Sequence, residues 1–456
     1  MVERVTIPHR VHVIGAGGAG MSGLAKLLSQ LGHDVSGSDL KPGRMLDALA
    51  DVGVESWIGH RPEAMTRVDL VIASSAVPDS DPELVAARSH GVTVWRRPTL
   101  LRALTTGRRT IGFAGTHGKT TSTALGVTAM REGIGQDPTF LVGGEMVGLN
   151  TGASLGADDV FLLEADEAFG TFRHLSLDAM LVTNIEPDHL DHYGSVAALE
   201  DAFAQVAATV DGPTIGCVDD AGVRRLAQRT DITTYGFSQD ATWRITSLEH
   251  SGGGVGFTLV GPRGSTDVSL RKPGEHLASN AAGVLALLGE SGYDVGAASR
   301  ALEGFAGVRR RYEIRAKVGG VTIVDDYAHH PTEVAATVAA ASVGSEGRVI
   351  VVFQPHRYTR TADLAPAFGA PLALADTVIV TDVYPAGERP MIGVSGRLVA
   401  EATEAAGGNV RFIPRLSDVA DVVASDVRPG DILLLLGAGD ITSIATDVAK
   451  AIEARR

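Results

Sequence analysis

Thr110-Ile-Gly-Phe-Ala-Gly-Thr-His-Gly-Lys-Thr-Thr121 is the stretch of this chain that most constrains its fold. The run from Ile111 to Ala114 is short and apolar, as in a buried strand, and the apolar residues from Ala124 to Met130 predict a helix. Gly115 and Gly118 allow the backbone to turn tightly between the two. The stretch therefore predicts a strand, a glycine-containing loop and a helix whose N-terminus faces an anion.

The polar residues of this loop suit a nucleoside triphosphate. Lys119 supplies a positive charge for the β and γ phosphates, and Thr120 supplies a hydroxyl for Mg²⁺. The general phosphate-loop pattern has glycine where this chain has Phe113, so an ordinary strand-to-helix turn is the alternative. The residues expected around the nucleotide are Gly115, Thr116, His117, Gly118, Lys119, Thr120 and Thr121.

Length and composition indicate a multidomain α/β enzyme. The chain has 456 residues, against a usual domain size of about 150 residues. Its 55 glycines and 44% hydrophobic residues favour a folded enzyme over a disordered chain. A formal charge of −14 argues against a nucleic-acid partner, and the single cysteine excludes an internal disulfide. We expect a cytoplasmic protein with no membrane insertion, either a monomer or a weak homodimer.

A second nucleotide signal opens the chain. The strand-like run Val11–Ile14 precedes Gly15-Ala-Gly-Gly-Ala-Gly20, and a second strand ends at Asp39, 19 residues after Gly20. This pattern predicts a tight turn, a helix N-terminus on a diphosphate and an acid on a ribose. Taken alone it favours NAD, but any nucleotide diphosphate presents the same groups.

Polar clusters follow several predicted strands. In parallel α/β sheets, ligands bind beyond the carboxyl ends of the strands, and strands alternating with helices predict parallel sheets throughout. Any one cluster is explained equally well as a solvated loop, but five of them favour a functional site. The clusters are Glu164–Glu167, Asn184–His192, Asp325–Pro331, Gln354–Arg360 and Gly437–Asp440.

Metal and anion ligands can be assigned within these clusters. Glu164 is the expected carboxylate for Mg²⁺, because hard cations prefer oxygen ligands, and His189 is a second candidate. Zinc is disfavoured because the chain has no paired cysteines. Arg357 and Arg360 offer guanidinium groups to a carboxylate or a phosphate.

Taken together, these motifs resemble those of the Mur ligases, ATP-dependent enzymes that add amino acids to a UDP-linked cell-wall precursor. The resemblance covers about Val11 to Asp440. Its most specific parts are Gly15–Gly23, Gly115–Thr121, Asn184–Asp191, Asp325–Glu333 and Gln354–Arg360.

The resemblance implies three α/β domains with mainly parallel sheets. These are a Rossmann-like N-terminal domain for the UDP substrate over residues 1–107, a P-loop-type central ATPase domain over 108–307, and a Rossmann-like C-terminal domain for the amino acid over 308–456.

The resemblance also implies roles for individual residues. Asn280, Arg311 and Asp326 join the loop residues in binding ATP. The expected metal ligands are Thr120, Glu164 and His189, and the expected catalytic residues are Lys119, His189, His330 and Arg357. The expected substrate-binding residues are Gly15, Gly17, Gly18, Ala19, Gly20, Asp39, Ser74, Ser75, His329, Arg357 and Arg360.

The activity implied is the addition of L-alanine to the lactyl carboxylate of UDP-N-acetylmuramate, with ATP and Mg²⁺, in peptidoglycan precursor synthesis. The carboxylate would attack the γ-phosphate to give an acyl phosphate, which the amine then attacks. Three alternatives stand beside it: a related ligase that attaches a whole murein peptide during recycling, a nicotinamide dehydrogenase, and a nucleotide-binding regulator without catalysis.

Two features of the chain bear on this assignment. Relatives usually carry Ser-Asp where this chain has Ala168-Phe169, which puts in doubt what the missing hydroxyl and carboxylate contact. Between Lys119 and Lys272 there is no lysine, so the carbamylated lysine of later-acting relatives cannot form there. The second feature favours the alanine-adding branch.

Overall fold

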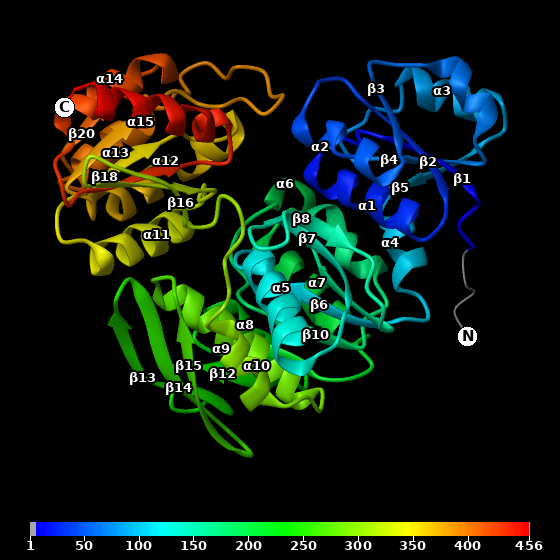
Figure 1. Cartoon of the computed structure of the whole chain (residues 1–456), viewed down its shortest axis with the longest axis horizontal. Helices are drawn as coiled ribbons and strands as arrows, with labels where there is room; N and C mark the ends of the chain where they lie inside the picture. The colour runs from blue at the N-terminus through cyan, green and yellow to red at the C-terminus, as the bar shows by residue number, and fades with distance from the viewer. Residues whose placement is uncertain (1–5, 456) are drawn as a thin grey trace. The chain divides into compact units, whose positions relative to one another are not determined.

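The computed structural model describes residues 6–455 of the chain, and these form three β-sheets with helices packed against them (Figure 1). Two compact units contain these sheets. One unit comprises the residues up to Thr246 together with Thr258–Val268 and Ser279–Phe305, and the other comprises Ser247–Phe257, Ser269–Ala278 and the residues from Ala306 onward. The predicted α/β fold with three mainly parallel sheets is confirmed. The exact domain boundaries stay a prediction.

The N-terminal sheet has five parallel strands in the order β3-β2-β1-β4-β5. Its strands are β1 (Arg10–Ile14), β2 (Asp34–Asp39), β3 (Glu55–Ile58), β4 (Leu70–Ala73) and β5 (Thr93–Arg96). The strand order reverses between β1 and β4, the place where a doubly wound sheet opens a crevice for a ligand. Its helices are α1 (Ala19–Gln30), α2 (Arg44–Asp47), α3 (Pro82–Ser89) and α4 (Arg97–Thr105).

The central sheet has ten strands in the order β15-β14-β13-β12-β11-β10-β6-β9-β7-β8. Its strands are β6 (Arg109–Ala114), β7 (Thr139–Met146), β8 (Thr151–Ser154), β9 (Val160–Glu164), β10 (Ala179–Val182), β11 (Thr214–Cys217), β12 (Thr233–Gly236), β13 (Trp243–Ser251), β14 (Gly254–Gly261) and β15 (Gly264–Leu270). Its helices are α5 (Lys119–Thr128), α6 (Leu190–Tyr193), α7 (Val196–Ala207), α8 (Ala221–Ala227), α9 (Glu275–Glu290) and α10 (Val295–Leu302).

Strand register in the central sheet aligns three chain segments that carry polar residues. β6 lies between β9 and β10 and is parallel to both, with Phe113 beside Glu164 and Ala114 beside Val182. The loops after these three strands therefore begin next to one another. Apolar runs produce this arrangement, because β6, β9 and β10 are buried along nearly their whole length.

The C-terminal sheet has six strands in the order β16-β17-β21-β18-β19-β20, of which only the β16–β17 pair is antiparallel. Its strands are β16 (Glu313–Val318), β17 (Val321–Asp326), β18 (Val349–Phe353), β19 (Thr377–Val380), β20 (Val410–Phe412) and β21 (Ile432–Leu436). Its helices are α11 (Pro331–Gly344), α12 (Tyr358–Ala373), α13 (Arg397–Ala405), α14 (Val419–Asp426) and α15 (Ala445–Ala454). One apolar core contains residues of α11, α12 and α13, and a second contains residues of α14 and α15.

Helix α1 joins the N-terminal sheet to the central one. Its apolar side, including Leu24 and Leu28, is buried, and it packs against the antiparallel β7–β8 hairpin. A side chain at Gly23 would lie 2.7 Å from Leu141 Cδ1, so this close approach requires glycine. Lys26 Nζ donates to Thr151 Oγ1 at 2.9 Å across the same contact.

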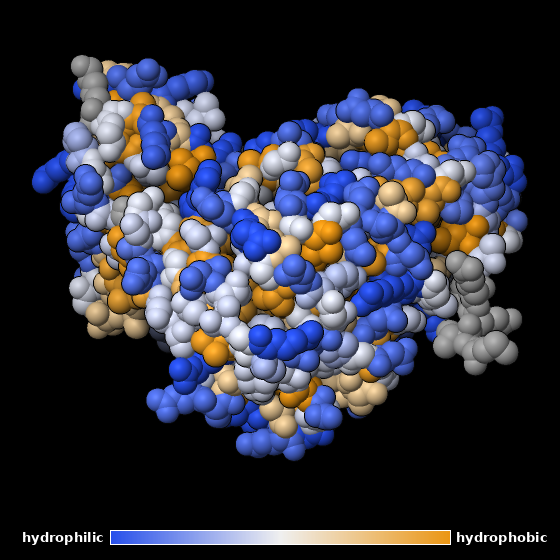
Figure 2. All heavy atoms as spheres, turned by 60° about the horizontal axis from the view of Figure 1, so that its bottom comes forward, coloured by the Kyte–Doolittle hydropathy of each residue, from blue (hydrophilic) through white to orange (hydrophobic). Residues whose placement is uncertain are grey.

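The surface carries scattered apolar groups. On the face shown in Figure 2, hydrophobic residues lie in small groups among hydrophilic ones. Among the helices of residues 6–455, none combines the length and the apolar character that crossing a membrane requires.

Candidate functional site

The predicted phosphate loop has the geometry of a tight anion cradle. Gly115 and Gly118 have φ values of 125° and 86°, which favour glycine. A side chain at Gly115 would lie 2.1 Å from Thr183 Oγ1, and one at Gly118 would lie 2.7 Å from Asn280 Oδ1. The loop is followed directly by α5, whose first N–H groups have no acceptor within the helix. These N–H groups are the donors that fit a phosphate.

Asn184, for which the sequence suggested no individual role, holds the part of the loop formed by Thr116 and His117. Its backbone oxygen accepts from Thr116 N at 3.1 Å, and its Oδ1 accepts from His117 N at 2.8 Å. Two amides expected to face the nucleotide therefore hold the loop against the segment after β10. The N–H groups of Thr116 and His117 are therefore engaged within the protein.

Lys119 occupies a strongly anionic environment. Its Nζ donates to both carboxylate oxygens of Glu167, at 2.9 and 2.8 Å, and to Gly115 O at 2.7 Å, and it lies 4.0 Å from Asp166 Oδ1. Burial by itself lowers the pKa of an ammonium group. The carboxylates of Glu167, Asp166 and Glu164 outweigh that effect and raise the pKa of Lys119. The lysine is therefore a permanent positive charge at the cradle.

The donor set near Lys119 fits a divalent cation. Three carboxylates surround one ammonium, which leaves negative charge that Mg²⁺ can balance, and oxygen ligands suit that ion. Glu164 ends β9 and accepts from Gly143 N through Oε1. His189, with φ of 53°, precedes α6, and its Nε2 lies 3.8 Å from Asp188 Oδ2; metal binding by Glu164 and His189 together stays a prediction. The side chain of Thr120 is buried at the start of α5.

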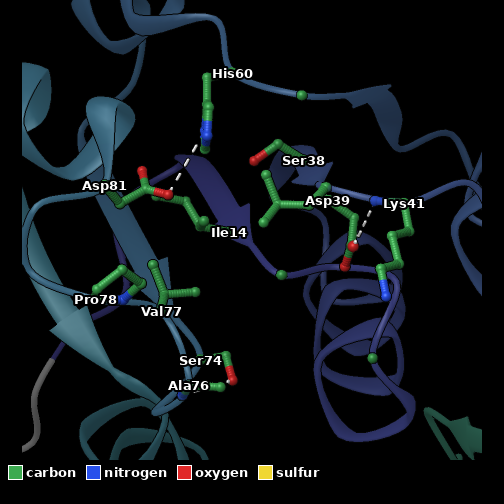
Figure 3. Close-up of a pocket in the computed structure, with 14 residues that line it drawn as sticks. Ile14, Ser38, Asp39, Lys41, His60, Ser74, Ala76, Val77, Pro78 and Asp81 are labelled. Carbon is green, nitrogen blue, oxygen red and sulfur yellow. Dashed lines mark hydrogen bonds and ion pairs between the residues drawn. The ribbon is translucent and has the colours of Figure 1, made fainter. Parts of the chain in front are cut away.

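A cleft of about 350 Å³ lies at the carboxyl edge of the N-terminal sheet (Figure 3). Gly15, Gly18, Asp39 and Ser74, all predicted to bind substrate, line it, and Ser38, Lys41, His60 and Asp81 line it too. In Figure 3, Ser38, Asp39 and Lys41 face Ser74, Val77 and Asp81 across the cleft. The predicted diphosphate loop thus borders a cavity at the strand-order reversal.

Asp39 makes contacts that the sequence did not indicate. Its Oδ2 accepts from Gly17 N at 2.9 Å, and its Oδ1 accepts from Lys41 N at 3.1 Å. The carboxylate therefore shapes the glycine loop, and its place as a ribose ligand stays a prediction. Lys41, whose side chain reaches the cleft, was not predicted, because a single exposed lysine carries no motif.

A buried polar network lies beneath this cleft. Glu83 accepts from Trp57 Nε1 and the Arg61 amide through Oε1, and from the Ser38 hydroxyl through Oε2, with His12 Nε2 at 3.5 Å. Burial alone raises the pKa of a carboxyl group, but the hydrogen bonds from His12, Ser38 and Arg61 lower the pKa of Glu83 to about 2. The network ties β1, β2, β3 and α3 together below the cleft.

In the C-terminal sheet, the loops after β17, β18 and β21 begin side by side, because Asp326 and Phe353 both align with Leu436. Arg357 has φ of 68° and donates from Nε to Glu388 Oε1 at 2.6 Å, so Glu388, which the sequence did not single out, orients it. Arg360 donates to His356 Nδ1 at 3.4 Å.

Two histidines of this cluster are kept neutral. Burial, as the largest effect, lowers the pKa of His329 to about 4 and that of His356 to about 4. Their ring centroids lie 6.0 Å apart. His329 Nδ1 is 2.9 Å from Tyr327 O, so the ring is fixed in orientation. The arrangement offers guanidinium groups for a carboxylate beside uncharged imidazoles.

The predicted ATP ligands of the C-terminal sheet are partly engaged with their own backbone. Asp326 accepts from Tyr312 N at 2.7 Å and Ala328 N at 2.8 Å, and burial raises the pKa of its carboxyl to about 6. The Cζ atom of Arg311 lies 5.1 Å from the centroid of the Tyr327 ring, and its Nη1 lies 3.8 Å from Glu333 Oε1. His330 forms a capping box with Glu333 at the start of α11. Their roles toward ATP stay predictions.

The departure at Ala168-Phe169 places an exposed aromatic ring near the cradle. Phe169 has φ of 55°, is 63% exposed and meets the ring of His192 edge-on at 6.1 Å. Ala168 N still donates to Asp166 Oδ1 at 3.2 Å, so the turn after β9 closes without a serine hydroxyl.

Comparison with known proteins matches three consecutive parts of the chain to one family. Residues 10–109 match the Mur ligase family catalytic domain, 113–288 the Mur ligase middle domain, and 310–439 the Mur ligase glutamate ligase domain. The chain is 42% identical to the UDP-N-acetylmuramate–L-alanine ligase of Mycolicibacterium vanbaalenii, over 98% of this chain and 97% of that protein. It is also 42% identical to the enzyme of that name from Kineococcus radiotolerans, over 100% of this chain and 98% of that protein.

Solved structures give the same result. The crystal structure of a UDP-N-acetylmuramate–alanine ligase from Thermotoga maritima is similar with a TM-score of 0.84 and 28% identity, over 98% of this chain and 100% of that one. A murein peptide ligase from Psychrobacter arcticus shares the fold with a TM-score of 0.71 at 23% identity, over 98% of this chain and 99% of that one.

The Glu83 network predicts a specific acid sensitivity. Because the pKa of Glu83 falls to about 2 from its usual 4.5, the network stabilises the fold above pH 4.5 and loses this contribution as the pH falls toward 2. Between pH 6 and pH 3.5 the wild type should lose about 1–2 kcal/mol more stability than Glu83→Gln. Urea unfolding at both pH values measures this difference. Glu63→Gln, at an exposed site, is the control and should follow the wild type; equal pH profiles for all three proteins would contradict the prediction.

Proposed function

The chain belongs to the Mur ligase family, and we propose that it joins L-alanine to the lactyl carboxylate of UDP-N-acetylmuramate, using ATP and releasing ADP and phosphate. The observation that carries this proposal is the 42% identity to ligases of that name over almost the whole of both chains. The product would be a precursor of peptidoglycan. A buried lysine at a phosphate cradle and a separate cleft at a glycine loop support two different nucleotide substrates.

Lys119 would stabilise the transferring phosphoryl group. A carboxylate is a poor nucleophile toward a triphosphate, because both are anions. Lys119, held at the cradle by Gly115 O and Glu167, can neutralise part of that charge in the transition state. Mg²⁺, held by Glu164, His189 and Thr120, would supply the remaining positive charge and orient the phosphates. The lactyl carboxylate then becomes an acyl phosphate with an activated carbonyl carbon.

The side chains that follow β17 and β18 would bind the amino acid. Arg357 and Arg360 can bind the alanine carboxylate, since guanidinium groups pair well with carboxylates. The incoming amine must lose a proton to attack, and His329 is a neutral imidazole whose Nδ1 donates to Tyr327 O, so its Nε2 is able to accept a hydrogen bond from the amine. His330 stays a predicted catalytic residue, and Asp326 stays a predicted ligand of ATP.

The function is tested by measuring which acceptor supports phosphate release. With UDP-N-acetylmuramate and ATP, we expect turnover with L-alanine, less with glycine, which lacks the methyl group and its apolar contact, and less with L-serine, whose hydroxyl must be desolvated. Murein tripeptide should give background release. Turnover with tripeptide alone would identify a peptide-recycling ligase instead, and no release with any acceptor would contradict both assignments.

Replacing Lys119 tests the chemistry at the cradle. We expect Lys119→Ala to lower turnover by at least ~10³, because a preorganised cation is lost from a phosphoryl-transfer site. Lys450→Ala removes a positive charge from an exposed position of α15 and should leave turnover unchanged. Melting temperatures of both variants check folding. Wild-type turnover in Lys119→Ala would rule out this assignment of the phosphate loop.

The absence of lysine between Lys119 and Lys272 gives a further prediction. A carbamylated lysine needs CO₂ and loses its modification at mildly acidic pH, so enzymes that use one are rescued by added bicarbonate. We expect no such rescue here. The test compares initial rates at pH 6 and pH 8 with and without bicarbonate at constant ionic strength, and recovery of a low-pH loss by bicarbonate would contradict the prediction.

A further inference from the structure

Arg97 is a cation at the junction of the two nucleotide sites, and no motif pointed to it. It is the first residue of α4, and its guanidinium lies 3.4 Å from the position that a Cβ at Gly20 would occupy. Gly20 belongs to the first turn of α1, directly after the glycine loop. On its other side Arg97 Nη1 lies 3.8 Å from Asp166 Oδ2, in the acidic segment beside Lys119.

The hydrogen bonds of Arg97 are incomplete. A guanidinium has five N–H donors, yet within residues 6–455 Nε of Arg97 is buried without a hydrogen-bond partner and its Nη1 comes no closer than 3.8 Å to Asp166. The side chain is only 24% exposed, so water does not fully replace these bonds. The ion pair with Asp166 is too long to be a hydrogen bond. Because buried polar groups are nearly always hydrogen-bonded, this guanidinium is expected to bind an acceptor.

Arg96, the preceding residue, shows what a structural arginine looks like here. It donates to Ser74 O at 3.0 Å, Val77 O at 2.7 Å and Asp79 Oδ1 at 2.7 Å. These bonds fasten the loop after β4. Arg97 has no comparable set, although it is the more buried of the two side chains, 24% exposed against 32%. A structural role like that of Arg96, which stabilises a loop through hydrogen bonds, therefore does not explain Arg97.

The space beside Arg97 favours an anion. The N-cap of α1 is Gly18, which has no side chain to cap the helix, and the first turn of α1 contains no acidic residue. Asp39, which accepts from Gly17 N at 2.9 Å, offsets part of the positive charge of this helix end, so the guanidinium of Arg97 supplies the full positive charge that borders the predicted diphosphate loop.

We propose that Arg97 binds an anionic oxygen group of the nucleotide sugar, either its diphosphate or its carboxylate, and that Asp166 pairs with Arg97 until this substrate arrives. The inference rests on the proposed function. Substrate binding would then release Asp166 beside Lys119, at the site of phosphoryl transfer. Arg97 would thereby couple occupation of the first nucleotide site to the charge balance of the second.

Calorimetric titration of the full chain tests this. We expect Arg97→Ala to weaken binding of UDP-N-acetylmuramate by about 10-fold or more, as for loss of a charge-assisted hydrogen bond, and Arg97→Lys to restore part of the affinity. Binding of ATP to Arg97→Ala should change as well, because Asp166 then lacks its ion pair with Arg97 and lies beside Lys119. Arg102→Ala, which removes an exposed arginine from the same helix, is the matched control and should bind like the wild type.

Three ligands identify the group that Arg97 binds. UDP-N-acetylmuramate has a diphosphate, a sugar and a carboxylate. UDP-N-acetylglucosamine has the diphosphate and a sugar but no carboxylate, and UDP has the diphosphate without the sugar or the carboxylate. A loss confined to UDP-N-acetylmuramate assigns Arg97 to the carboxylate, whereas an equal loss for all three assigns it to the diphosphate. Unchanged affinity of both Arg97 variants for all three overturns the inference. If the wild type itself does not bind UDP-N-acetylmuramate, the proposed function fails, which is a separate result.

Discussion

The buried ion pair between Lys119 and Glu167 is the interaction on which the rest of the site depends. Burial lowers the pKa of an ammonium group that has no partner, and a neutral amine cannot stabilise a transferring phosphoryl group; the side chain of Lys119 is only 14% exposed. Glu167, only 1% exposed, keeps the lysine charged and directs it at the loop carbonyls. The same pairing places Glu167 where phosphate oxygens are expected, so ATP must compete with it for Lys119. The free protein thus carries its own anion at the cradle.

Strand order explains how distant parts of the sequence meet at this ion pair. β6 carries the cradle, β9 leads into the acidic segment with Asp166 and Glu167, and β10 leads into Asn184. Because these strands are parallel neighbours, their loops leave the same sheet edge. The N-terminal sheet adds Arg97 to the same junction through α4, and packing of α1 on the β7–β8 hairpin fixes its position. Charge balance at the site therefore depends on apolar packing elsewhere.

The sequence predicts this framework well and the contacts within it poorly. Apolar runs located β1, β6, β9, β10, β17, β18 and β21, because buried parallel strands consist of such runs. The β7–β8 hairpin and β16 were not predicted: β8 and β16 are less apolar strands at sheet edges, and the apolar run of β7 is interrupted by Gly143-Gly144-Glu145. The contact of Asp39 with a ribose stays a prediction, and its bond from Gly17 N was not predicted, because a spacing rule gives the residue and not the contacts of its side chain. Arg97 and Glu388 belong to no motif, and only tertiary contacts reveal them.

The segment after β9 shows which part of a motif the fold requires. Phe169 and Gly170 both have positive φ, at 55° and 66°, a costly conformation for phenylalanine. The turn persists because its backbone is held elsewhere: Ala168 N donates to Asp166, and Tyr193 Oη donates to Glu167 O at 2.6 Å. These bonds position the two acids facing Arg97 and Lys119 without any hydroxyl at position 168. In this chain the turn after β9 therefore closes on backbone groups and on Tyr193, and Phe169 lies edge-on to the ring of His192 beside it.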